Sequence, residues 1–336
     1  MRAAVVEAVG SPPALGDVDE PAPDARSALV EVEAAPLNPV EIRVAAGRHA
    51  RQAQPPYVPG LEGVGRVLES ARIPPGRRVR FESAALPGFG ANGTLAERAA
   101  VPEESLVALP DEAPADLAAA LGVVGITALL AIERAAPAGG ARVLVLGATG
   151  AVGQAAVQLA KLLGAGRVVG AGRNAEALQR IRELGADEVV ELASPGGRGQ
   201  TPPPGGRAAP DLAEAFEEAA GGPLDIVVDP LWGEPAMAAL RVLATEGRLV
   251  NVGQSAGTDV RIPLELVRNR QGAIHAISSG WTGLERKASL YDRLLDYSLA
   301  GHLTVDREVV PLEDVGAAWE RQDASPGRKL VISLAG

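Results

Sequence analysis

Residues 143–165, VLVLGATGAVGQAAVQLAKLLGA, constrain the fold of this chain more than any other stretch. An apolar strand pattern runs directly into Gly147, Gly150 and Gly153, and an apolar helix pattern follows at once. The amino terminus of such a helix offers unpaired N–H groups and a partial positive charge. A tight βα turn without a ligand is the alternative. The surrounding strand, helix and next strand favour a turn that binds the phosphates of a dinucleotide.

The turn residues expected to bind this cofactor are Gly147, Ala148, Thr149, Gly150, Ala151, Val152 and Gly153. The second strand, which ends in VVGAG, indicates which dinucleotide is preferred. NAD-binding chains usually carry an acidic residue there for the ribose hydroxyls. This chain instead has Gly172, Arg173 and Asn174. Small residues leave room for a 2′-phosphate, and Arg173 can pair with it, so NADP(H) is favoured over the alternative of a solvated loop arginine.

The wider pattern predicts two domains in a chain of 336 residues. From residue 142 to about 252, apolar strands alternate with helices, which is typical of an α/β fold with a doubly wound parallel sheet. Residues 1–110 contain short alternating runs separated by Pro and Gly, which predict a compact β-rich domain. The pattern becomes helical near Leu109, and Asp116 is expected to cap the following helix.

Composition excludes several classes of partner. The formal charge of −10 argues against nucleic-acid binding. No basic run indicates a membrane surface, and no apolar run is expected to span a membrane. There are no cysteines, so a cytoplasmic location is the default expectation. Residues 194–210, SPGGRGQTPPPGGRAAP, read as a mobile surface insertion.

Several motifs in order resemble the medium-chain dehydrogenase/reductase superfamily, and specifically its zinc-free quinone oxidoreductase (zeta-crystallin-like) branch. They include PLNPVEIRVAAG (36–47), PYVPGLEGVGRV (56–67), GTLAERAAVP (93–102), LGVVGITALLAI (121–132) and the glycine turn. The resemblance covers nearly the whole chain.

The resemblance implies a Rossmann-type domain inserted into a GroES-like β-rich catalytic domain. The expected boundaries are 1–121 plus 281–336 for the catalytic domain and 122–280 for the NADP-binding domain. The family places its active site in the cleft between such domains. It often forms homodimers through the sixth strand of the Rossmann sheet, which here is GAIHAISS (272–279).

A metal site is not expected. The zinc branch of the superfamily has Gly-His-Glu where this chain has Gly60-Leu61-Glu62, so leucine replaces the histidine ligand. Catalytic zinc needs three protein ligands, and the chain also lacks the cysteines. Glu62 is therefore expected to be a structural acid, buried and hydrogen-bonded or paired.

The resemblance also assigns roles to single residues. Asn38, Glu41 and Thr127 are expected in the catalytic site, although Asn38 could cap a turn, Glu41 could be solvated and Thr127 could cap a helix. Many family members have tyrosine where this chain has Arg43, so Arg43 either lies in the site or faces solvent. Tyr57 lies near in sequence but occupies a position that is usually structural. Further residues assigned to the cofactor are Asn251, Val252, Gly253 and Lys329, the last with a solvated lysine as the alternative.

Together these features predict an NADPH-dependent reductase that transfers hydride, without metal, to a quinone or an activated C=C (enone) acceptor. An acceptor that is already electrophilic asks mainly for correct placement against the nicotinamide. Two alternatives stay open: an enoyl-thioester reductase of a biosynthetic pathway, and a non-catalytic NADPH-binding sensor or interaction protein.

Overall fold

The computed structural model describes residues 1–84, 86–136, 139–193 and 211–334. The expected insertion at 194–210 lies outside the described residues. The chain forms two compact units. The first comprises Met1–Val123, Thr282–Leu299 and Val305–Gly336, and the second comprises Val124–Trp281 and Ala300–Thr304.

The short segment 300–304 belongs to the second unit because Gln158 holds it there. The Gln158 side-chain amide donates to the carbonyl oxygen of Thr304 at 2.7 Å, and the Thr304 N–H donates back to Gln158 Oε1 at 2.9 Å. The domain boundaries expected from the sequence placed residues 300–304 in the catalytic domain, with the rest of 281–336.

The second unit contains one six-stranded sheet in which every neighbouring pair of strands is parallel. The strand order is β10-β9-β8-β11-β12-β13, so the order reverses between β8 and β11. This is the doubly wound, dinucleotide-binding arrangement predicted from the sequence, and ligands bind to it at the carboxyl ends of the strands beside the reversal. Its strands are β8 (Arg142–Val145), β9 (Arg167–Gly172), β10 (Glu188–Glu191), β11 (Leu224–Asp229), β12 (Leu243–Asn251) and β13 (Ala273–Ala276).

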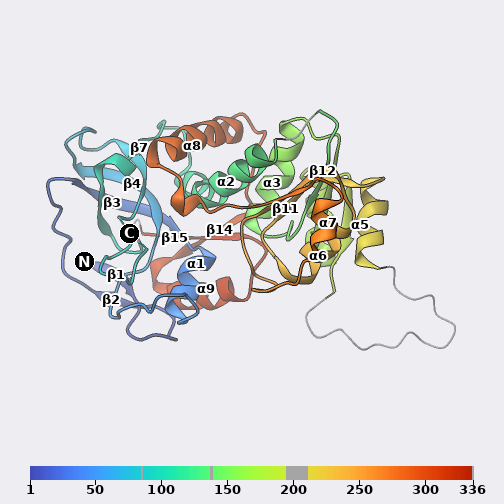
Figure 1. The fold of residues 1–336 in the computed structure, drawn as a ribbon. Helices are drawn as coiled ribbons and strands as arrows, with labels where there is room; N and C mark the ends of the chain where they lie inside the picture. The colour runs from blue at the N-terminus through green and yellow to red at the C-terminus, as the bar shows by residue number, and fades with distance from the viewer. Residues whose placement is uncertain (85, 137–138, 194–210, 335–336) are drawn as a thin grey trace. The chain divides into compact units, whose positions relative to one another are not determined.

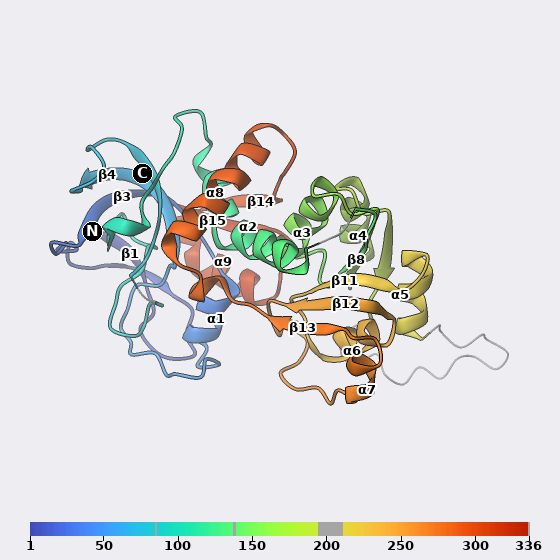
Figure 2. The same cartoon turned by 45° about the horizontal axis from the view of Figure 1, so that its top comes forward.

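Helices connect these strands and pack on the sheet. Figure 2 shows α3 and α4 on one side of β11 and β12, and α6 on the other. Right-handed crossovers that leave the reversal point in opposite directions require this separation. The helices of the sheet are α3 (Ala151–Leu162), α4 (Ala175–Glu183), α5 (Leu212–Ala220), α6 (Gly233–Arg241) and α7 (Leu264–Arg268).

Helix α2 (Ala115–Ala135) corrects two sequence expectations. It is long and apolar enough to cross a membrane by length and composition, contrary to the expectation that no such run exists. However, 72% of its most apolar window is buried inside the protein, which is typical of a core helix. Asp116 lies in the first turn rather than at the cap, because the helix already begins at Ala115, and its carboxylate pairs with Arg307 at 2.6 Å.

The first unit is built on a seven-stranded, mostly antiparallel sheet (Figure 1). The C-terminal strand β15 pairs with β3, so the end of the chain completes the sheet that the beginning starts. The strands of this unit are β1 (Arg2–Val5), β2 (Ala14–Asp17), β3 (Ser27–Pro36), β4 (Glu62–Glu69), β5 (Arg78–Glu82), β6 (Arg98–Pro102), β7 (Val107–Ala108), β14 (Arg307–Pro311) and β15 (Lys329–Ser333). Its helices are α1 (Pro39–Ala45), α8 (Leu284–Leu299) and α9 (Val315–Asp323).

Each unit has its own apolar core. In the first unit, residues of the two ends of the chain share one cluster, which includes Val30, Phe81, Trp319 and Ile332. In the second unit, the cluster lies between the sheet and the helices and includes Leu144, Phe216 and Leu240.

The close approach of α3 to β8 depends on Gly153. A Cβ atom at Gly153 would meet the carbonyl oxygen of Gly147 and lie 2.6 Å from Ala148 Cα, and both are backbone atoms that cannot give way cheaply. We predict that Gly153→Ala lowers the free energy of unfolding by about 2 kcal/mol. Chemical denaturation followed by circular dichroism measures this.

Gly150→Ala is the matched control. The contact of a Cβ atom there is the Gly147 carbonyl oxygen at 3.5 Å, and the backbone is extended, at φ −80° and ψ 162°. We expect its stability to stay within about 1 kcal/mol of the wild type. Equal stability of the two variants would contradict this account of the turn.

Candidate functional site

The glycine turn lies at the carboxyl end of β8, beside the reversal of strand order. Gly147 adopts φ +58°, and the Gly150 N–H donates to its carbonyl oxygen at 3.0 Å. Gly150 is exposed and directly precedes α3. The first N–H groups of a helix have no partner within the helix, so the half-buried residues Ala151 and Val152 present donors that suit a phosphate.

The tip of β9 lies against this turn. Gly172 is buried, and a Cβ atom there would lie 2.8 Å from Thr149 Cγ2, so no larger residue fits. Arg173 is exposed and has no ion-pair partner among the described residues. Asn174 is the N-cap of α4, and its Oδ1 accepts the Ala177 N–H at 2.9 Å. Arg173 is thus a cation available to a ligand at this tip, whereas Asn174 already has a structural role.

Asp229, at the end of β11, is a site residue that sequence reasoning missed. It is fully buried and accepts hydrogen bonds from the N–H groups of Leu231 and Trp232 and from Asn251 Nδ2, at 2.8–2.9 Å. Burial raises the pKa of this carboxyl, and the three donors oppose that shift. The signal was the acidic residue that ends the strand in DIVVDPL, before Pro230.

Asp229 positions the loop predicted to border the nicotinamide. Asn251 ends β12, and its side chain also donates to the carbonyl oxygen of Gly253 at 2.7 Å. The Val252 N–H donates to the Asp229 carbonyl oxygen at 2.8 Å. These residues therefore lie at the same edge of the sheet as the glycine turn, and contact with a cofactor stays a prediction.

Thr127 lies within α2 and is 8% exposed. Its hydroxyl donates to Ser279 Oγ at 3.1 Å. The alternative that Thr127 caps a helix is wrong, because the helix runs on both sides of it.

In the first unit, Asn38 and Glu41 form a closed pair at the start of α1. The Asn38 N–H donates to Glu41 Oε2 at 3.1 Å, and Glu41 Oε1 accepts the Leu61 N–H at 2.7 Å. Glu41 is 2% exposed, so the alternative of a solvated carboxylate is wrong. Burial raises the pKa of Glu41 to about 7, although these hydrogen bonds and Lys329 favour the charged form.

Lys329 is likewise buried rather than solvated. Its ammonium group donates to Asn38 Oδ1 at 2.6 Å, and burial lowers its pKa although Glu62 and Glu41 oppose the shift. The structure thus brings Lys329 together with Asn38 and Glu41. Its contact with a cofactor stays a prediction.

Glu62 is a buried structural acid, as the sequence predicted. Its side chain is 2% exposed and pairs with Arg80 at 2.9 Å. The Val123 N–H donates to both of its oxygens, at 2.8 and 3.0 Å, and Asn38 Nδ2 lies within 3.4 Å. Gly122 is the kink in α2, and a Cβ atom at Gly122 would collide with the Glu62 carboxylate. The carboxylate therefore takes the place that a longer residue 122 would occupy.

The buried charges continue from Arg80 to α8. Arg80 also pairs with Glu82 at 2.7 Å, and Lys287 of α8 pairs with Glu82 at 2.6 Å. Burial disfavours the charge of Glu82, but Arg80 and Lys287 outweigh it and lower its pKa. The Arg80 guanidinium lies 5.3 Å from the centre of the Tyr291 ring. Each of these buried charges thus has an opposite charge or a hydrogen-bond partner, as burial requires.

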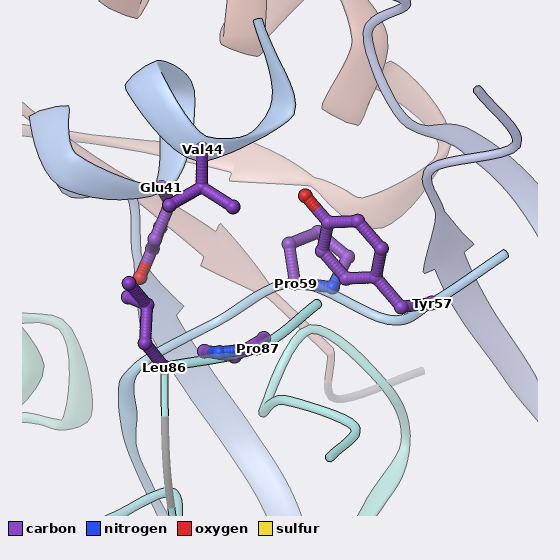
Figure 3. A pocket seen from close by; sticks show the side chains of 6 residues that line it. All are labelled: Glu41, Val44, Tyr57, Pro59, Leu86 and Pro87. Atoms are coloured by element: carbon purple, nitrogen blue, oxygen red, sulfur yellow. The ribbon is translucent and has the colours of Figure 1, made fainter. Parts of the chain in front are cut away.

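A small pocket opens beside Glu41, which we call the Glu41 pocket. Figure 3 shows its lining, in which the Glu41 and Tyr57 side chains stand on opposite sides. It is lined by Glu41, Val44, Tyr57, Pro59, Leu86 and Pro87. Arg43 lies in the last turn of α1, is half-buried and does not belong to this lining, so its place in an active site stays a prediction.

Among the described residues, no cluster of three or more His, Asp or Glu side chains is arranged as metal ligands. At the position of the zinc branch's histidine, Leu61 contributes its backbone N–H to Glu41.

A β-rich unit that includes both chain ends, together with a six-stranded dinucleotide-binding sheet, defines the class of medium-chain dehydrogenases/reductases. Comparison with known proteins agrees. Residues 24–111 match the alcohol dehydrogenase GroES-like domain, and residues 151–283 match the zinc-binding dehydrogenase domain.

The quinone oxidoreductase from Thermus thermophilus, solved alone and in complex with NADPH, is similar over 99% of this chain and 100% of its own, with 31% identity and a TM-score of 0.76. An NAD-dependent alcohol dehydrogenase is similar over the full length of both chains, with 26% identity and a TM-score of 0.85. The bovine (Bos taurus) quinone oxidoreductase-like protein 2 is 32% identical over 71% of this chain and 64% of its own length. The chain belongs to the quinone oxidoreductase-like branch of the medium-chain dehydrogenase/reductase superfamily. It spans less than two thirds of the length of curated relatives that it matches at 32–34% identity.

The buried pair of Glu62 and Arg80 generates a stability prediction. Glu62→Gln removes the charge that faces Arg80 and places an amide group against the Val123 N–H. We expect a loss of about 3 kcal/mol in the free energy of unfolding, measured by chemical denaturation.

Glu308→Gln is the matched control, because Glu308 pairs with Arg321 at the surface. Surface pairs contribute little, so we expect a change within about 1 kcal/mol. A Glu62→Gln protein as stable as this control would refute the structural role of Glu62.

Proposed function

We propose that this protein is an NADPH-dependent reductase that transfers hydride, independently of zinc, to a quinone or an enone acceptor. The observation that carries the proposal is the carboxyl edge of the six-stranded sheet. There the glycine turn, the β9 tip with exposed Arg173, and the 251–253 loop converge on one ligand-binding edge. Family membership supports the oxidoreductase class of the activity.

The residues present fit a dinucleotide phosphate. Exposed Gly150 and the first turn of α3 offer backbone donors without an intervening side chain. Gly172 is buried against Thr149, which keeps the β9 tip close to the glycine turn. Arg173 then supplies the charge for a 2′-phosphate. NADPH, when bound, provides a hydride at C4 of its nicotinamide.

The acceptor chemistry follows from the side chains of the first unit. The Glu41 pocket is mainly apolar, and its surroundings offer Glu41, Asn38 and Lys329 rather than a set of zinc ligands. Carbonyl polarisation by a Lewis acid is therefore not part of the proposal. A quinone or an enone is already electrophilic, so the protein's task is to bind and orient it in an apolar site.

The direct test is NADPH oxidation with a panel of quinones and α,β-unsaturated carbonyl compounds, using protein treated with a chelator. The proposal expects turnover with at least one of these acceptors. Tight NADPH binding without turnover of any acceptor would instead favour a non-catalytic sensor or interaction protein. Turnover restricted to enoyl thioesters would favour a biosynthetic enoyl reductase.

The preference for NADPH over NADH depends on Arg173. We predict that Arg173→Gln raises the KM for NADPH about 10- to 100-fold, because a charge-assisted hydrogen bond to the 2′-phosphate is lost. The KM for NADH should change by less than about twofold, because NADH lacks that phosphate. Steady-state kinetics with both cofactors measures this.

Arg134→Gln, an exposed arginine in the last turn of α2, is the control and should leave both constants unchanged. A wild type that prefers NADH, as the NAD-dependent structural neighbour suggests, would contradict the NADPH assignment.

We also propose a homodimer formed through β13. This strand is the edge of the six-stranded sheet, and Trp281 nearby is 94% exposed. The Ile277 N–H donates to the Asn251 carbonyl oxygen of β12 at 3.0 Å, so the preceding Ala276 N–H points away from the sheet. An edge with free donors and a large exposed apolar side chain suits pairing with a second copy.

We predict that the wild type sediments as a dimer and that Ala276→Pro sediments as a monomer, because proline removes the outward donor. Ala276→Ser keeps the N–H and should remain dimeric. Analytical ultracentrifugation measures the mass. A monomeric wild type or a dimeric Ala276→Pro protein would refute this interface.

A further inference from the structure

The Tyr57 side chain is held in a single orientation in the wall of the Glu41 pocket. Its backbone exchanges two hydrogen bonds with Val6, at 2.9 and 3.2 Å. The backbone of Gly88 packs directly on the ring, since a Cβ atom there would lie 3.0 Å from Tyr57 Cζ. Gly88 also adopts φ +91°, which favours glycine. The backbone of Gly88 therefore limits movement of the ring on that side.

The Tyr57 hydroxyl has no hydrogen-bond partner among the described residues, although it is fully buried. The residue as a whole is 5% exposed. Leaving a buried hydroxyl unsatisfied is costly, so such groups are rare and need a reason. The other fully buried tyrosine, Tyr291, follows the rule, because its hydroxyl donates to the Ala118 carbonyl oxygen at 2.8 Å.

The phenol group stays protonated near neutral pH, so it is able to donate a hydrogen bond. Burial raises the pKa of Tyr57 to about 12, and the nearby charge of Glu41 adds to the shift. Glu41 does not accept a hydrogen bond from the hydroxyl, and its oxygens accept the N–H groups of Asn38 and Leu61. The pocket therefore contains one oriented donor with an unmet need for an acceptor oxygen.

We propose that the Tyr57 hydroxyl binds the carbonyl oxygen of the acceptor and is a catalytic residue of the reduction. This inference rests on the proposed function and names the substrate group that this site recognises, an uncharged conjugated carbonyl. When NADPH is bound, its C4 hydride would add to the β carbon of the conjugated double bond, leaving NADP⁺, and the π electrons would move towards the carbonyl, so negative charge develops on that oxygen. The resulting enolate would then take a proton from water at its α carbon. A fixed donor aimed at this charge stabilises the transition state more than the ground state.

The Glu41 carboxyl, on the opposite side of the pocket, adds a selection by charge (Figure 3). Above pH 7, where the Glu41 carboxyl is charged, an acceptor that carries a carboxylate would bring a second negative charge beside it. An uncharged quinone or enone avoids that repulsion. The pocket as it stands is too narrow for a water molecule, so an acceptor reaches the hydroxyl only if Leu86 and Pro87, which line the pocket from a loop, move aside.

Tyr57→Phe tests the proposal with little risk to folding, because the hydroxyl it removes makes no hydrogen bond within the described part of the chain. We expect the variant to unfold at the same temperature as the wild type or higher. Its affinity for 2-cyclohexenone, measured by ligand-observed NMR in the presence of NADP⁺ so that no turnover occurs, should fall about fivefold. Its kcat/KM for enone reduction with NADPH should fall about 100-fold.

Tyr291→Phe is the matched control with the opposite pattern. It removes a satisfied buried hydroxyl, so its unfolding temperature should fall while its affinity for 2-cyclohexenone stays unchanged. Equal affinity of the wild type and Tyr57→Phe, or no binding of 2-cyclohexenone by the wild type, would overturn the assignment of Tyr57. Failure of the proposed function is a separate result: the wild type would then show no NADPH oxidation with any of the acceptors tested.

Discussion

The pairing of Glu62 with Arg80 and with the Val123 N–H is the interaction on which the rest of the first unit depends. One carboxylate joins strands β4 and β5 to the kink of α2, and only glycine fits at position 122 beside it. A buried charge without partners would cost several kcal/mol, so removing any one member leaves the others unsatisfied. Asn38 connects this group to Glu41 and Lys329, so one hydrogen-bonded cluster joins residues that lie far apart in the sequence.

The two units differ in the kind of binding site that their residues form. In the second unit, backbone groups and small residues prepare a phosphate site, and Asp229 fixes the 251–253 loop through hydrogen bonds. In the first unit, the described buried side-chain atoms without a hydrogen-bond partner are Arg80 Nε, Gln322 Oε1 and the Tyr57 hydroxyl, and of these three residues only Tyr57 lines the Glu41 pocket. The unpaired Tyr57 hydroxyl is informative because most buried polar groups have hydrogen-bond partners. A ligand that accepts a hydrogen bond from this hydroxyl removes the free-energy cost of leaving it unpaired.

Much of the fold could be predicted from the sequence because it is encoded locally. Strand and helix periodicity indicated the alternating strands and helices of the parallel sheet from residue 142 to about 252, and the glycine spacing indicated the turn at Gly147. Long-range pairing could not be predicted in this way. Nothing near Glu62 in sequence identifies Arg80 as its partner, nor Lys329 as the partner of Asn38. The role of Asp229 and the burial of Glu41 also depend on tertiary contacts. Helix α2 shows that local composition can also mislead. Its length and composition would suit a membrane span, and only its burial identifies it as a core helix.

The central claim is that hydride passes from a nicotinamide to a conjugated acceptor without metal. Mass spectrometry of the product formed from 2-cyclohexenone and NADPH deuterated at both C4 positions by chelator-treated protein tests it most directly. The account predicts one deuterium atom in the reduced ketone, on the carbon β to the carbonyl. Reduced ketone without deuterium, or transfer that appears only after zinc is added back, would contradict it.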